Sequence, residues 1–117
     1  MPPFDAARLL RDYGDHGLVR DLAQLLVTTL PPQIDAVTNA VSARDSVAVR
    51  AAAHKLRGSI VPFGVPEGVE AARQLEAIAA AGDLSGADAL SRELVQSAQS
   101  LRHSASTWLA TGAAVQE

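Results

Sequence analysis

Residues 87–108 read ADALSRELVQSAQSLRHSASTW, and this stretch decides the fold. Its apolar positions recur every three or four residues: Ala87, Leu90, Leu94, Ala98, Leu101, Ala105 and Trp108. That spacing places them on one face of an α-helix. It predicts a long amphipathic helix over about residues 85–109, with Ser85 as its cap. Strand-like alternation of apolar and polar residues is absent from the sequence.

The same periodicity predicts further helices upstream. Gly14 ends a short first helix in a left-handed cap, Asp15 restarts the chain, and Asp45 or Ser42 caps the third helix. Adjacent prolines at 31 and 32 predict a kink or break in the second helix. The expected bounds are about 4–13, 16–43, 46–61, 66–81 and 85–109, followed by a flexible tail at 110–117. We therefore expect an all-α protein, an up-down four-helix bundle with an additional short N-terminal helix, forming one domain over residues 1–117.

Composition excludes several classes of function. The 117 residues carry a formal net charge of −3 without a basic run, so we expect no binding to nucleic acid. The absence of cysteine removes disulfides and thiolate metal sites. Because no apolar run reaches the length of a membrane span and no leader is recognisable, we expect a cytoplasmic location and no membrane insertion.

Three histidines are candidates for chemistry, and His54 stands apart from the others. His16 lies in a polar connection and His103 points away from the apolar stripe of its helix, so both read as solvated surface residues. At 100° per residue, the face of His54 also carries Val47, Arg50, Arg57, Gly58 and Val61. The buried stripe is expected on the other side, at Val49, Ala52, Leu56, Ser59 and Phe63. The imidazole of His54 should therefore be exposed.

The neighbours of His54 suit a phosphoryl group. Gly58, in the middle of a helix, costs about 1 kcal/mol relative to alanine and leaves clearance one turn after the ring. Lys55 and Arg57 place positive charge beside the imidazole, where they could hold phosphoryl oxygens. Val47, Val61 and Arg50 form a surround that a docking partner could bury. A solvated helix face with an incidental histidine has the same pattern, so geometry leaves both interpretations open.

The stretch Ala53-His54-Lys55-Leu56-Arg57-Gly58-Ser59, followed by Gly64, resembles the signature of histidine-containing phosphotransfer (HPt) domains. Arg57 stands where the family usually has lysine. The resemblance extends to the short first helix, the Asp45 position, the Leu75-Glu76 pair and the final amphipathic helix. After Ser59, the apolar run from Ile60 to Phe63 departs from the family pattern and indicates a more apolar docking rim.

The resemblance implies a phosphocarrier in a multistep two-component phosphorelay and not an enzyme with its own turnover. His54 would accept a phosphoryl group from the aspartate of one response-regulator receiver domain, such as that of a hybrid sensor histidine kinase, and pass it to another. No metal or other cofactor is expected on this chain, with Mg²⁺ on the receiver. We expect a monomer. A chemotaxis-kinase-type phosphoacceptor domain and a receiver-binding module without phosphotransfer are the alternatives; a metal enzyme is disfavoured because His54 lacks a second ligand one turn away.

Overall fold

The computed structural model describes residues 2–112 as a bundle of helices. The elements are α1 (Ala6–Tyr13), α2 (His16–Ser42), α3 (Ser46–Ile60), a short 3₁₀ turn (Val61–Phe63), α4 (Pro66–Ala80), α5 (Ala87–Thr107) and a π-helical turn (Trp108–Gly112). No strand occurs within the described residues, so the prediction of an all-helical fold is confirmed.

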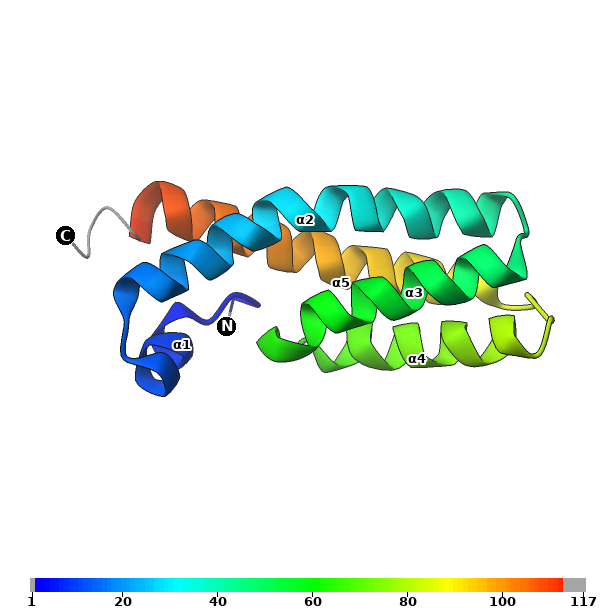
Figure 1. Ribbon diagram of the computed structural model, residues 1–117, viewed down its shortest axis with the longest axis horizontal. Coiled ribbons are helices and arrows are strands. Elements are labelled where there is room, and N and C mark those ends of the chain that lie inside the picture. The colour runs from blue at the N-terminus through cyan, green and yellow to red at the C-terminus, as the bar shows by residue number, and fades with distance from the viewer. Residues whose placement is uncertain (1, 113–117) are drawn as a thin grey trace.

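The four long helices run alternately up and down, and α1 lies across one end of them (Figure 1). Each long helix packs against two others: α3 contacts α2 and α4, and α5 contacts α2 and α4. The fully buried large side chains belong to all four: Val19, Leu30, Val37, Val49, Leu56, Ile60, Leu75, Leu94 and Leu101. Within residues 2–112, no helix is both long and apolar enough to cross a membrane.

Three aspartates cap the N-termini of helices. The sequence predicts this role for Asp15 and Asp45. The carboxylates of Asp5, Asp15 and Asp45 accept hydrogen bonds from backbone N–H groups three residues later, at 3.0–3.2 Å. Each bond satisfies a donor that the first turn of a helix leaves unpaired. Gly14 ends α1 at φ +69°, a left-handed conformation that glycine adopts without steric cost. The Asp45 cap sets where α3, the helix that carries His54, begins.

Of the kink or break predicted at Pro31 and Pro32, the break does not occur, because helix α2 is continuous through both prolines. Figure 1 shows the helix axis changing direction near its middle instead. Both prolines are exposed. Leu26, Leu30 and Ile34 are buried on either side of them. The core packing therefore holds one helix together across two residues that cannot donate backbone hydrogen bonds.

The three- and four-residue spacing of apolar residues in the sequence predicts one buried stripe along α2, at Leu18, Leu22, Leu25, Leu26, Leu30, Ile34, Val37 and Val41. The first half of this stripe is wrong. Val19 and Ala23 are buried there, whereas Leu18 is 38% exposed and Leu25 is 60% exposed. Figure 1 shows that α3 and α4 end short of the start of α2, and Leu25 lines the open hollow between α2 and the end of α3. These leucines therefore lie on the surface although their spacing is that of a core stripe.

The buried face of α3 is rotated slightly from the prediction. Val49, Leu56 and Phe63 are buried as expected, but Ala53 and Ile60 complete the stripe instead of Ala52 and Ser59, which are half-buried. The Ser59 hydroxyl donates to Oε1 of Gln33 on α2 at 2.6 Å. A hydroxyl with a polar partner on the next helix is satisfied at the edge of the core, where burial is incomplete.

The last helix differs from the prediction at both ends. Gly86 and not Ser85 is the residue before α5; it has φ +80° and makes no side-chain cap. The Ser85 N–H instead donates to Asp83 in the preceding turn. The expected tail begins later than 110, because Trp108–Gly112 continues α5 as a π-helical turn in which Thr111 donates to the Thr107 carbonyl. Residues 113–117 of the predicted tail lie outside the described residues.

Candidate functional site

His54 lies on the outer face of α3, near the middle of the bundle. Its neighbours Ala53 and Leu56 are fully buried, and this fixes α3 so that the intervening side chain of His54 points to solvent. The imidazole is 70% exposed. The sequence-based expectation that His54 is exposed agrees with this position.

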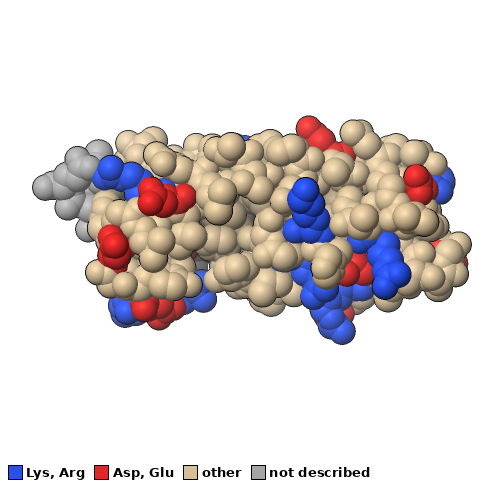
Figure 2. Space-filling model, in the orientation of Figure 1, with Lys and Arg blue, Asp and Glu red and all other residues tan. Residues whose placement is uncertain are grey.

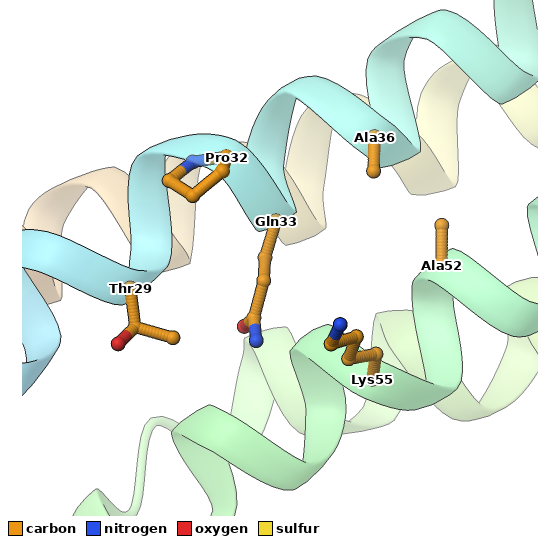
Figure 3. A pocket seen from close by; sticks show the side chains of 6 residues that line it. All are labelled: Thr29, Pro32, Gln33, Ala36, Ala52 and Lys55. Carbon is orange, nitrogen blue, oxygen red and sulfur yellow. The ribbon is translucent and has the colours of Figure 1, made fainter.

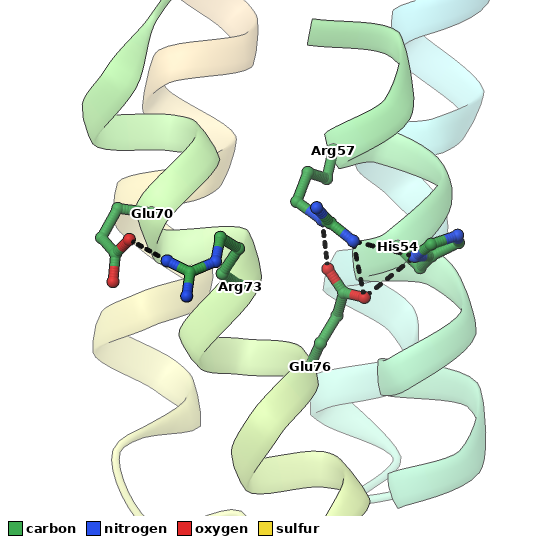
Figure 4. A network of polar contacts seen from close by, with 5 residues as sticks. All are labelled: His54, Arg57, Glu70, Arg73 and Glu76. Atoms are coloured by element: carbon green, nitrogen blue, oxygen red, sulfur yellow. Dashed lines mark hydrogen bonds and ion pairs between the residues drawn. The ribbon is translucent and has the colours of Figure 1, made fainter. Parts of the chain in front are cut away.

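A carboxylate from the neighbouring helix reaches the imidazole. Glu76 on α4 places Oε1 2.9 Å from Nδ1 of His54 and accepts a hydrogen bond from Nε of Arg57 through Oε2 at 2.6 Å (Figure 4). Arg57 also donates from Nη2 to Oε1 at 3.4 Å. The Glu76 side chain is only 15% exposed and that of Arg57 is 30% exposed. The ion pair is therefore partly shielded from water, while the histidine beside it is open.

The position of the proton on His54 follows from these contacts. Nδ1 also lies 3.2 Å from Nη2 of Arg57, a donor that would need Nδ1 to be unprotonated. Glu76 is an acceptor only and needs a proton on Nδ1. The contact with the carboxylate is shorter, and hydrogen bonds to ionised groups are the stronger ones. We therefore assign the proton to Nδ1, which leaves the lone pair on Nε2.

Lys55 and Arg57 point to opposite sides of His54. Arg57 reaches α4, whereas Lys55 extends toward α2 and lines a surface groove of about 380 Å³ (Figure 3). The rest of this groove is formed by Thr29, Pro32, Gln33, Ala36 and Ala52. The two cations thus flank the ring, as the sequence suggested, but only Arg57 is held by a carboxylate that also contacts His54.

Gly58 lies on the apolar side of the site. A Cβ atom built there meets nothing within 4 Å, so the glycine is not required by packing inside the protein. It borders a hollow of about 220 Å³ between α2 and the end of α3, lined also by Leu22, Leu25, Leu26, Thr29, Ser59, Pro62 and Phe63. Val61, at the end of α3, is 49% exposed. We call the surface formed by Gly58, Val61 and this hollow the apolar flank.

The opposite side of the site, between α3 and α4, is charged. A hollow of about 280 Å³ is lined by Arg50, Arg57, Arg73, Glu76, Ala77 and Ala80. We call this set the polar flank. Figure 2 shows blue basic groups gathered around a red acidic group over α3 and α4, in a chain whose net charge is −3. Val47 lies in the first turn of α3, before Arg50 in the chain, and is 81% exposed.

The other two histidines are placed differently from each other. His103 is exposed on α5, as predicted. The prediction for His16 is wrong: it is half-buried and its ring packs on Trp108 with centroids 5.6 Å apart, since α5 extends far enough to cover it. Among the described residues, no group of three or more His, Cys, Asp or Glu side chains could hold a metal ion.

Glu76 is the functional candidate that the sequence reasoning did not select. It appeared only as part of the Leu75-Glu76 pair in the family resemblance. Leu75 is fully buried, and a carboxylate next to a core position is held close to the neighbouring helix. The position of Glu76 next to the buried Leu75 is the only local indication of its role, because His54 lies 22 positions away along the chain.

A comparison with protein families agrees with this geometry. The model of the Hpt domain matches residues 21–106, which includes α3, α4 and most of α2 and α5. The chain therefore belongs to the Hpt domain family. Domains of this family are phosphocarrier modules that act in histidine phosphotransfer and interact with receiver domains in phosphorelays. No curated protein and no solved structure matches the chain significantly.

Proposed function

We propose that this protein accepts a phosphoryl group on Nε2 of His54 from the phospho-aspartate of one receiver domain and transfers it to the aspartate of another. The observation that carries the proposal is the contact between Nδ1 and Glu76, which favours the tautomer of the neutral imidazole that keeps its lone pair on Nε2 of an exposed ring. A neutral imidazole with a free lone pair is a nucleophile at neutral pH.

The transfer step needs no proton from solvent. The Nε2 lone pair attacks phosphorus, the P–O bond to the aspartate breaks, and the aspartate leaves as a carboxylate. The ring then carries the phosphoryl group on Nε2 and keeps its proton on Nδ1, so it becomes positively charged. Glu76 stabilises that charge through the hydrogen bond already present. In the second transfer, the incoming aspartate attacks phosphorus and the N–P bond breaks.

The surrounding residues have separate roles in this proposal. Arg57 and Lys55 approach the phosphoryl oxygens from opposite sides and offset their charge. Gly58 keeps one side of the ring uncovered, and Arg50, Val47 and Val61 contact the docked receiver. Phosphoryl transfer depends on placing the reacting atoms in line and on excluding water. A receiver that covers both flanks supplies that exclusion.

This chain contributes the histidine and the receiver contributes the metal ion. Mg²⁺ would be held by the receiver, and this protein would work as a monomer without a cofactor of its own. The donor would be a receiver of the kind found in hybrid sensor histidine kinases. Removal of Mg²⁺ with a chelator should stop transfer from phosphorylated receivers, whereas labelling of His54 by phosphoramidate should continue.

The deciding experiment compares wild type with His54→Gln, using phosphorylated receiver domains as donors. We expect acid-labile, alkali-stable label on wild type and none on His54→Gln. His103→Gln, which removes another exposed histidine on α5, is the matched control and should be labelled like wild type. Circular dichroism should show the same helix content in all three proteins, because both side chains lie outside the core.

Two outcomes would contradict the proposal. Label retained in His54→Gln would place the phosphoryl group elsewhere. Receiver binding without label on wild type, under conditions in which phosphoramidate also fails to label it, would make the protein an interaction module. Label supplied only by a histidine kinase and never by a receiver would identify a phosphoacceptor of the chemotaxis-kinase type.

A further inference from the structure

Arg50 is the unpaired cation of the polar flank. Of the three arginines around this hollow, Arg57 is bound by Glu76 and Arg73 is bound by Glu70 at 2.7 Å. Within the described part of the chain, Arg50 makes no hydrogen bond or ion pair. It is exposed and lies four residues before His54, so one helical turn separates the two side chains on the same face.

The carboxylates around the hollow are already occupied. Hydrogen bonds from Gln74 and Arg73 lower the pKa of Glu70, which keeps it ionised and paired. Glu76 binds Arg57 and His54. Counting Arg50, Arg57 and Arg73 against Glu70 and Glu76 leaves one positive charge, contributed by Arg50. The remaining wall is made of Ala77 and Ala80, which leave room for a side chain from outside.

We propose that the polar flank binds an acidic side chain of the partner receiver and that Arg50 is the residue that recognises it. The proposal rests on the phosphotransfer function proposed above. An incoming Asp or Glu would pair with the free guanidinium of Arg50, since Arg57 and Arg73 already have carboxylate partners. Arginine binds carboxylates through two parallel hydrogen bonds, so the contact would also orient the partner over His54.

The occupant should be a protein carboxylate and not a free anion, because the hollow is open and shallow beside a site that must be covered for transfer. Receivers with an acidic side chain at the matching position would be accepted, and receivers with a neutral or basic one would be disfavoured by an unpaired or like charge. Arg50 would thus select among partners without taking part in the transfer step.

The test is the rate of phosphoryl transfer from a panel of receivers phosphorylated with acetyl phosphate. For the receivers that react fastest with wild type, Arg50→Glu should raise KM by about tenfold or more, since close charge pairs at protein interfaces couple by about 1.5 kcal/mol or more. Arg50→Ala should raise it less and should weaken the salt dependence of kcat/KM. Arg11→Glu is the control: it makes the same change in net charge on α1, at the end of the bundle.

Phosphoramidate separates this proposal from the proposed function. It labels His54 without docking, so labelling of the wild type by phosphoramidate tests the histidine independently of any receiver. A wild-type protein that receivers do not label would remove the proposed function itself. Unchanged KM in Arg50→Glu, or an equal rise in Arg11→Glu, would overturn the role of Arg50 while leaving the function intact. Saturable binding of inorganic phosphate that Arg50→Ala abolishes would show a free-anion site and overturn the assignment to a partner carboxylate.

Discussion

The two flanks of His54 are built in opposite ways. On the polar flank, α3 and α4 supply Arg57 and Glu76, whose charges are already paired with each other and directed at the ring. On the apolar flank, α3 ends early and leaves Gly58 and Val61 beside a hollow that nothing in the described chain fills. The Arg57–Glu76 pair is complete within the protein, whereas the apolar flank is completed only when a partner binds. Substitutions of Arg57 or Glu76 should therefore affect the chemical step, whereas substitutions on the apolar flank, like those of Arg50, should affect docking.

The largest effect after loss of His54 is expected at Glu76. Glu76→Ala removes the acceptor for the Nδ1 proton, so the charge that develops on the ring loses its counter-ion. A hydrogen bond to a charged group contributes about 1.5–3 kcal/mol, which corresponds to a rate loss of about 10- to 100-fold. Single-turnover transfer from a phosphorylated receiver measures this, and the loss should appear in the maximal rate more than in KM.

Two variants make the Glu76 prediction specific. Glu76→Gln keeps a carbonyl oxygen that can accept from Nδ1, so it should recover part of the rate. Glu70→Gln removes a carboxylate at an exposed pair on the same helix and should leave the rate unchanged. If Glu76→Ala raised KM and left the maximal rate intact, Glu76 would act in docking and not in the chemical step, and the contrast between the Arg57–Glu76 pair and the apolar flank would fail.

The next effect separates stability from function at Gly58. Gly58→Ala should stabilise the protein by about 1 kcal/mol, because alanine is the better helix former and its Cβ meets no atom within 4 Å. Gly58→Leu should also fold, yet its side chain would occupy the apolar hollow. Thermal unfolding measures the first effect and receiver-dependent transfer measures the second, with a loss of about tenfold expected for Gly58→Leu. Full transfer by a folded Gly58→Leu protein would show that no partner group enters the hollow.

The sequence was sufficient for features that one helix determines by itself. The caps at Asp15 and Asp45, the left-handed Gly14 and the exposure of His54 depend on neighbours within a few residues. Periodicity also identified the four long helices, because an apolar stripe that repeats over several turns has few alternative structures.

What the sequence could not provide depends on how the helices meet. Glu76 reaches His54 only because α4 packs beside α3, and no local pattern specifies that pairing. Leu25 has the spacing of a core residue but is exposed, because it lines the open hollow between α2 and the end of α3. His16 was predicted to be solvated, but Trp108, in the turn that continues α5, packs against its ring. In each case the missing information is the length and placement of a different helix.

The smallest effect compares two exposed valines that lie seven residues before and after His54. Val61 belongs to the apolar flank, whereas Val47 is 81% exposed and lies one turn before Arg50 on α3. Changing either to serine should alter the free energy of unfolding by no more than about 0.5 kcal/mol, since neither is in the core. Val61→Ser should raise KM for a phosphorylated receiver by a few-fold and Val47→Ser by less, because burial beside an apolar hollow removes more surface from water. Equal effects would mean that the receiver covers α3 evenly along its length, and the apolar flank would then have no special part in docking.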